Sequence, residues 1–191
     1  MYPRLLINRA YISENVRTVR ALCDAHNIEI TGVTKVFRAD PLIAAAYICG
    51  GIKTLGDSRV ANLKRLRDLP AERQLIRPPM PCEIEETAEY ADSSLNSEWE
   101  VIEALARASA KRGKTHKIIL MADLGDIREG YVDYDELLRD AECAERLEGA
   151  TVAGVGVNLT CFSFVQYDSE KLSQLAELAR RIEEAVGHKL S

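Results

Sequence analysis

A lysine stands at the end of a short apolar stretch, in the segment IEITGVTKVFRADP. Lys35 follows the apolar residues and precedes Asp40-Pro41, a pair typical of a helix start. A lysine amine is a nucleophile only when it is neutral, and burial beside other cations lowers its pKa. Lys35 is therefore a candidate to condense with a carbonyl carbon, and the alternative is a surface lysine whose amine stays in water. The arginines that are candidates for such neighbours are Arg38, Arg59, Arg77 and Arg128.

Polar residues also follow the other apolar stretches of the chain. Asp57, Asn96, Asn158 and Cys161 each come at or just after the end of such a stretch. If the stretches are parallel strands, their C-terminal ends share one mouth, where we expect Asp57 and Asn96 to contact a ligand. Cys161 is a candidate for proton exchange if the pKa of its thiol is lowered. The alternatives are structural: a helix cap at Asp57, a capping box beginning at Ser97, and an inert half-buried thiol at Cys161.

The segment DLGDIREG contains a second candidate for ligand binding. Gly125 and Gly130 permit a tight turn. Arg128 lies between them, and its planar guanidinium is suited to holding an oxyanion. The alternative is a surface turn that Asp123 caps, because acidic and glycine-rich turns are common.

The elements that must position these residues alternate along the chain. Apolar residues at steps of three and four predict amphipathic helices, among them residues 12–25 and 169–186. Six short apolar runs lie between the helices, and they are too short for helices themselves. Such runs are typical of parallel strands covered on both faces. They are IEITGVTK, IKTLGDS, RQLIRP, DSSLN, KIILMADLGD and TVAGVGVNLT.

Six strand–helix units in succession predict an α/β fold with a parallel sheet. A doubly wound open sheet and a (β/α)8 TIM-type barrel both satisfy this order. No GxGxxG follows the first run, and polar residues end each run, which favours the barrel. A complete barrel has eight units and typically about 250 residues. We therefore expect residues 1–191 to be one incomplete barrel domain, cut from a longer protein.

Composition excludes several classes of protein. The net charge is -5, and no run of lysine and arginine predicts a nucleic-acid partner. No apolar stretch approaches a membrane span. The five cysteines contain no CxxC pair, so we expect no metal site and reduced thiols of a cytoplasmic protein.

Five segments in order resemble the alanine racemase-like family of pyridoxal-phosphate-dependent proteins: GVTKV, DSRVANL, SLNSE, HKIILMADLGDIREG and GVGVNLTC. The resemblance covers essentially the whole chain and is strongest to the ornithine/alanine racemase branch. It implies a barrel domain followed by a β-rich C-terminal domain, a homodimer, and a small amino acid as substrate. It also implies that Lys35 holds pyridoxal phosphate as a Schiff base and that Arg128 lies near the phenolic oxygen of this cofactor.

Two departures from the alanine racemase pattern bear on the substrate. Those enzymes have a tyrosine four residues after the lysine, where this chain has Ala39, and a histidine against the cofactor ring, where it has Asn158. Both differences favour the ornithine-type branch. The resemblance implies that Lys35 serves one face of the substrate in proton transfer. The second base is not evident, and Cys161 is a speculative candidate.

Other functions remain open within the same resemblance. A related group of single-domain barrels binds pyridoxal phosphate without catalysis, although its second-strand segment reads Gly-Glu-Asn, whereas this chain has Gly56-Asp57-Ser58. A decarboxylase of the same barrel type and a non-catalytic interaction module are further alternatives. Barrel phosphate sites usually follow strands seven and eight, and the six predicted units include neither strand. We therefore expect this chain alone to be inactive.

Overall fold

The computed structural model describes residues 3–159, 166 and 168–190. The chain divides into two compact units, Met1–Gln74 and Leu75–Ser191. Cys161 lies outside the described residues.

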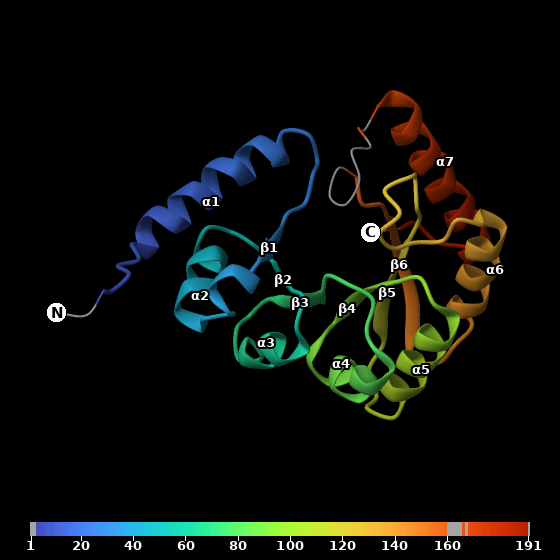
Figure 1. The fold of residues 1–191 in the computed structure, drawn as a ribbon, viewed down its shortest axis with the longest axis horizontal. Coiled ribbons are helices and arrows are strands. Elements are labelled where there is room, and N and C mark those ends of the chain that lie inside the picture. The colour runs from blue at the N-terminus through green and yellow to red at the C-terminus, as the bar shows by residue number, and fades with distance from the viewer. Residues whose placement is uncertain (1–2, 160–165, 167, 191) are drawn as a thin grey trace. The chain divides into compact units, whose positions relative to one another are not determined.

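The first unit alternates helices with short strands (Figure 1). Asp40 caps the second helix as the sequence predicted, since its Oδ1 accepts hydrogen bonds from the Leu42 and Ile43 amides at 2.9 and 3.3 Å. Pro41 is the first helical residue. The elements are α1 (Arg9–Asp24), β1 (Thr31–Val33), the 3-10 helix η1 (Lys35–Phe37), α2 (Pro41–Cys49), β2 (Thr54–Asp57), α3 (Val60–Arg65) and β3 (Glu72–Leu75), whose last residue belongs to the second unit.

The second unit continues the alternation and ends in a long helix. The helix α5 begins at Trp99, within the segment expected to open it, but its N-cap is Glu98 and has no side-chain capping bond, so the capping box at Ser97 is not formed. The elements are η2 (Pro81–Glu83), α4 (Ile84–Tyr90), β4 (Ser93–Asn96), α5 (Trp99–Ala110), β5 (His116–Met121), α6 (Tyr134–Glu145), β6 (Ala150–Gly156) and α7 (Ser169–Val186).

The strands form one six-stranded sheet in chain order, from β1 to β6. The pairs β1–β2, β4–β5 and β5–β6 are parallel. The predicted α/β fold with six strand–helix units is therefore confirmed. Parallel strands place their C-terminal ends on the same edge, so Lys35 and Asp57 follow or end neighbouring strands of the first unit.

The core of the first unit is small, and its first helix is largely exposed. Leu55 and Ala44 are fully buried between β2 and α2, together with Leu66. The apolar stripe predicted on α1 is not a core face here, because Val19 is 51% exposed and Leu22 67%. Part of this stripe lines an apolar groove with residues of β1, η1 and α2, and the lining includes Ile12, Val16, Val33, Phe37 and Ile43.

The core of the second unit is much larger. In Figure 1, α4 to α7 lie around β4, β5 and β6. Ile118, Leu120 and Val152 of the strands are fully buried with Ile102 and Leu137 of the helices. Alternate strand residues point to opposite faces, so these three strand residues define the helix-covered face.

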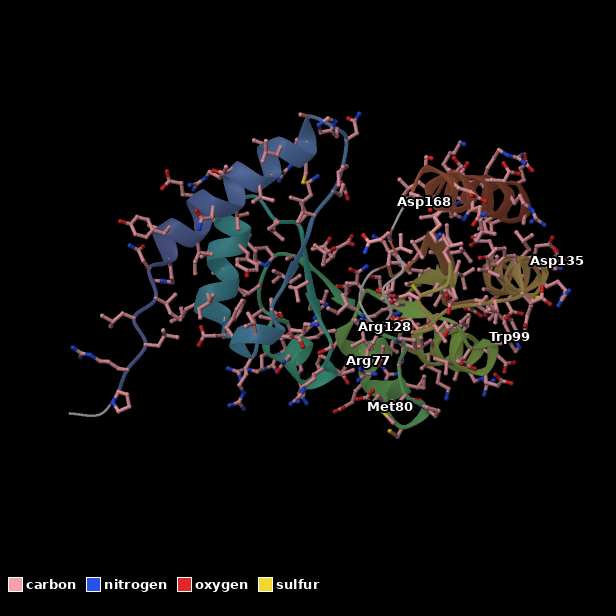
Figure 2. All side chains as sticks on the ribbon, turned by 45° about the horizontal axis from the view of Figure 1, so that its top comes forward. Arg77, Met80, Trp99, Arg128, Asp135 and Asp168 are labelled. Carbon is pink, nitrogen blue, oxygen red and sulfur yellow. The ribbon has the colours of Figure 1, made fainter. Side chains whose placement is uncertain are left out.

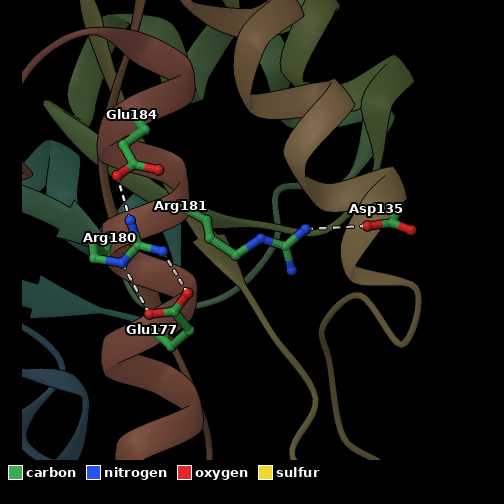
Figure 3. A network of polar contacts seen from close by, with 5 residues as sticks. All are labelled: Asp135, Glu177, Arg180, Arg181 and Glu184. Atoms are coloured by element: carbon green, nitrogen blue, oxygen red, sulfur yellow. Dashed lines mark hydrogen bonds and ion pairs between the residues drawn. The ribbon is translucent and has the colours of Figure 1, made fainter.

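The outer face of α7 carries charge pairs at helical spacing (Figure 3). Arg180 pairs with Glu177 one turn before it and with Glu184 one turn after it. Arg181 reaches Asp135 of α6 at 3.2 Å, which ties the two helices together at the surface. Exposed pairs of this kind contribute little to the free energy of unfolding.

Candidate active site

Lys35 lies where the sequence placed it, just beyond the C-terminal end of β1. It opens η1, and its side chain is exposed. Among the described residues, its amine has no hydrogen-bond or ion-pair partner. The first unit therefore does not bury Lys35 as expected. Its position beyond the C-terminal end of a parallel strand is nevertheless where active sites of barrel enzymes lie.

The turn after Lys35 is compact and returns the chain directly to α2. The Arg38 amide donates to the Lys35 carbonyl at 3.2 Å, and the Ala39 amide donates to the Thr34 carbonyl at 3.1 Å. Arg38 and Ala39 adopt left-handed φ values of 54° and 50°. Ala39 is fully buried in the core of the first unit. Ala39, where the resemblance led us to expect a tyrosine in alanine racemases, is thus part of the packed interior.

Asp57 is fully buried at the end of β2, and three donors surround its carboxylate. Its Oδ2 accepts a hydrogen bond from Thr34 Oγ1 at 2.7 Å. Its Oδ1 accepts from the Arg59 amide and from Asn62 Nδ2, both at 3.0 Å. These bonds fasten the start of α3 and the residue before Lys35. Asp57 does not cap α3 itself, because Arg59 is the N-cap and no side-chain capping bond is formed. Its burial and its three donors nevertheless argue against direct contact between Asp57 and a ligand.

Asn96 is also fully buried, on the helix-covered side of β4. It pairs in register with Leu120, which lies in the core of the second unit. Its Nδ2 donates to the Ser94 carbonyl at 2.8 Å and to Ser94 Oγ at 3.0 Å. Ser94 Oγ in turn lies 2.9 Å from His116 Nε2. This placement argues against the expected contact between Asn96 and a cofactor and assigns Asn96 to a buried polar network.

Burial holds His116 of this network in its neutral form. The imidazole is 2% exposed. Desolvation lowers its pKa from 6.5 to about 4, against the opposing effects of Asp92 and of a backbone hydrogen bond to Ala91. His116 therefore serves the interior of the second unit.

The DLGDIREG segment forms a closed loop after β5. Asp123 Oδ1 accepts from the Gly125 amide at 2.6 Å and from the Ile127 amide at 3.2 Å, which confirms the turn that Asp123 was expected to cap. Backbone bonds between Tyr131 and residues Met121 and Asp123 close the base of the loop. Gly130 is required there, because its φ is +134° and a Cβ would lie 2.6 Å from the Ala122 carbonyl carbon.

This loop brings Arg128 and Asn158 together through a residue that the sequence reading missed. Arg128 Nε donates to Glu129 Oε2 at 3.1 Å, and Asn158 Nδ2 donates to Glu129 Oε1. The Arg128 side chain, labelled in Figure 2, is 35% exposed, whereas that of Glu129 is 13% exposed. The signal in the sequence was an acidic residue directly after the arginine of the glycine-bounded motif.

Two further expectations concern cations and metals. Arg77 forms an ion pair with Glu83, at 2.7 Å between Nη2 and Oε2, so its charge is compensated locally. Within the described part of the chain, no group of three or more histidine, cysteine, aspartate or glutamate side chains has a metal-binding arrangement. No helix among these residues is long and apolar enough to cross a membrane.

Comparison with known proteins adds to this geometry. The family model for the alanine racemase N-terminal domain matches residues 7–190. The chain belongs to the alanine racemase family. Ornithine racemase of Acetoanaerobium sticklandii is 36% identical over 179 residues, which are 94% of this chain and 51% of the relative. Lysine racemase of Thermotoga maritima is 35% identical over 190 residues, which are 98% of this chain and 52% of the relative.

The chain thus spans about half the length of the curated relatives that it matches. Among solved structures, PipY of Synechococcus elongatus with PLP bound aligns with a TM-score of 0.77 at 18% identity. That alignment covers 94% of this chain and 85% of PipY, and it supports the α/β barrel-type fold.

Proposed function

We propose that this chain is the cofactor-binding portion of a pyridoxal-phosphate-dependent amino-acid racemase of the ornithine/lysine type. The single observation that carries the proposal is the position of Lys35, beyond the C-terminal end of β1, on a backbone fixed by the buried carboxylate of the next strand. Membership of the alanine racemase family and two relatives named as racemases of basic amino acids support it.

The residues present fit the proposed cofactor. The Lys35 amine is exposed and has no partner among the described residues, so it can reach an aldehyde carbon and hold it covalently with loss of water. When bound, pyridoxal phosphate supplies an electron sink for the substrate's α-carbon. Lys35 then holds or moves a proton at its Nζ on one face of that carbon.

Arg128 and Asn158 are the other proposed cofactor contacts. A guanidinium remains charged at all working pH values and stabilises negative charge on an oxygen. The shared carboxylate of Glu129 fixes the orientation of both side chains. Cys161 stays the speculative second base for the opposite face.

A second candidate is a non-catalytic protein that binds the same cofactor. The observation that favours it is the shared fold: PipY, solved with PLP bound, aligns with this chain at a TM-score of 0.77. Both candidates use Lys35, so a binding experiment tests their common part and an activity experiment separates them.

The binding experiment compares Lys35→Ala with Lys53→Ala. Both lysines are exposed, and Lys53 directly precedes β2, at the opposite end of the parallel strand pair. We expect wild type and Lys53→Ala to form an imine absorbance band with pyridoxal phosphate, and borohydride to fix the cofactor mass on Lys35. Lys35→Ala should lose both signals. Retention of the band in Lys35→Ala would refute the assignment.

The activity experiment incubates the protein with single enantiomers of ornithine, lysine, serine and alanine. Racemisation of ornithine or lysine by the longest natural form that contains this chain supports the racemase. Imine formation without racemisation supports the binding protein. We propose further that the protein is cytoplasmic and homodimeric, and light scattering of the purified protein tests the homodimer. We expect no racemisation by the 191-residue chain alone, so measurable turnover by it would contradict that expectation.

A further inference from the structure

Thr34 and Asp57 join the two strand ends beside the candidate lysine. The Thr34 amide donates to the Gly56 carbonyl at 2.8 Å, which continues the β1–β2 ladder by one residue. Thr34 Oγ1 donates to Asp57 Oδ2 at 2.7 Å. Both residues are fully buried, although they stand at the end of the sheet where side chains usually meet water.

A carboxylate at this position is costly to bury. Removing an ionised group from water costs several kcal/mol unless hydrogen bonds replace its hydration. The three donors of Asp57 come from three places: the residue before Lys35, the backbone at the start of α3, and the Asn62 side chain on α3. The contacts to the start of α3 use only Oδ1, so the bond from Oδ2 to Thr34 needs another explanation.

That bond fixes the direction in which Lys35 leaves the sheet. The turn after Lys35 is anchored to the same residue, because the Ala39 amide donates to the Thr34 carbonyl. Thr34 is thus held through its amide, its carbonyl and its hydroxyl, and Lys35 is the next residue. A lysine side chain has four rotatable bonds, so reproducible placement of its amine depends on a fixed backbone.

We infer that Asp57 and Thr34 are positioning residues that orient Lys35 for covalent capture of an aldehyde. The inference rests on the proposed function for the identity of that aldehyde, pyridoxal phosphate. It replaces the expectation of a direct ligand contact for Asp57, and it assigns to Thr34 a role that the motif GVTKV alone did not indicate.

The test uses the two oxygens of the same carboxylate. Thr34→Val removes the hydroxyl on Oδ2 at nearly constant volume, and Thr34→Ser restores a hydroxyl. Asn62→Ala is the matched control, because it removes a partly buried donor from Oδ1 and leaves Thr34 in place. Unfolding by urea is measured for each variant, so that loss of structure is recognised separately.

The main readout is the rate at which borohydride traps pyridoxal phosphate on Lys35. We expect Thr34→Val to lower this rate about tenfold, as the loss of a hydrogen bond to a charged group would. Thr34→Ser and Asn62→Ala should stay within about twofold of wild type. Equal losses in Thr34→Val and Asn62→Ala would overturn the inference, since the carboxylate would then act only on stability.

A second readout does not need the cofactor. Competitive acetylation compares the reactivity of the Lys35 and Lys53 amines in the same sample. We expect Thr34→Val to change the Lys35 to Lys53 ratio and Asn62→Ala to leave it unchanged. If wild type fails to capture pyridoxal phosphate, the proposed function fails, and an unchanged acetylation ratio in Thr34→Val would separately overturn the positioning role.

Discussion

The two units hold their candidate cofactor residues in different ways. In the first unit, Lys35 follows a threonine that is fully buried against a fully buried carboxylate. In the second unit, Arg128 is oriented by Glu129 in a loop where the arginine side chain is 35% exposed. The proposed covalent anchor is thus placed by buried polar contacts, and the proposed electrostatic contact is placed by a partly solvated one.

The apolar cores show the opposite distribution. The second unit buries residues from two strands and four helices around Ile118 and Leu120. The first unit has a small core around Leu55, and α1 buries only Ser13. The unit that places its candidate lysine by buried polar contacts therefore has the smaller apolar core, and its α1 contributes little to that core.

The largest expected effect tests this contrast in packing. Ile102 of α5 is 0% exposed and lies in the core of the second unit, so Ile102→Ala should lower the free energy of unfolding by about 2 to 5 kcal/mol. Val19 of α1 is 51% exposed, and Val19→Ala should change the free energy of unfolding by less than about 0.5 kcal/mol. Urea unfolding followed by circular dichroism and by the fluorescence of Trp99 measures both.

Trp99 is the only tryptophan in the chain and packs against the core of the second unit, so its signal reports on that unit. If Val19→Ala costs as much as Ile102→Ala, α1 is covered in the folded protein, and the contrast between the units would not hold.

The next effect concerns pH and is confined to the second unit. The pKa of His116 is lowered to about 4 in the folded protein, against 6.5 in the unfolded chain, mainly by desolvation. The unfolded chain therefore binds more protons between these values, and stability falls as the pH drops through this window. The free energy of unfolding is then lower by about 3 kcal/mol at pH 4 than at neutral pH. Urea midpoints across the window should show this slope, and His116→Gln should flatten it.

His188 provides the control for this pH dependence. Its pKa is raised mainly by a hydrogen bond to the Lys189 carbonyl and to a lesser degree by Glu145. Any stability that His188 contributes is therefore lost as the pH rises. His188→Gln should therefore leave the loss of stability below pH 6.5 unchanged. A wild-type slope that persists in His116→Gln would show that other groups cause it.

The periodicity of the sequence was sufficient for the order of elements but not for side-chain environment. The six apolar runs and the α2 start at Pro41 followed from local chemistry, which is strong there. The sequence did not reveal that Asn96 and Asp57 are buried, because a residue at the end of a strand has the same pattern whichever face it occupies. Glu129 was missed for a related reason: its two partners are distant in sequence from one another.

The smallest expected effect tests the partly solvated side of the comparison. Glu129→Gln keeps the side-chain volume but removes the charge that orients Arg128 and Asn158. Because the pair is partly solvated, we expect pyridoxal phosphate to bind only about fivefold more weakly, near 1 kcal/mol, with no change in the trapping site on Lys35. Glu142→Gln, which removes an exposed partner of Arg146 on α6, should bind as wild type does. Titration of the imine absorbance measures both affinities, and unchanged binding in Glu129→Gln would mean that the loop holds Arg128 by its backbone alone.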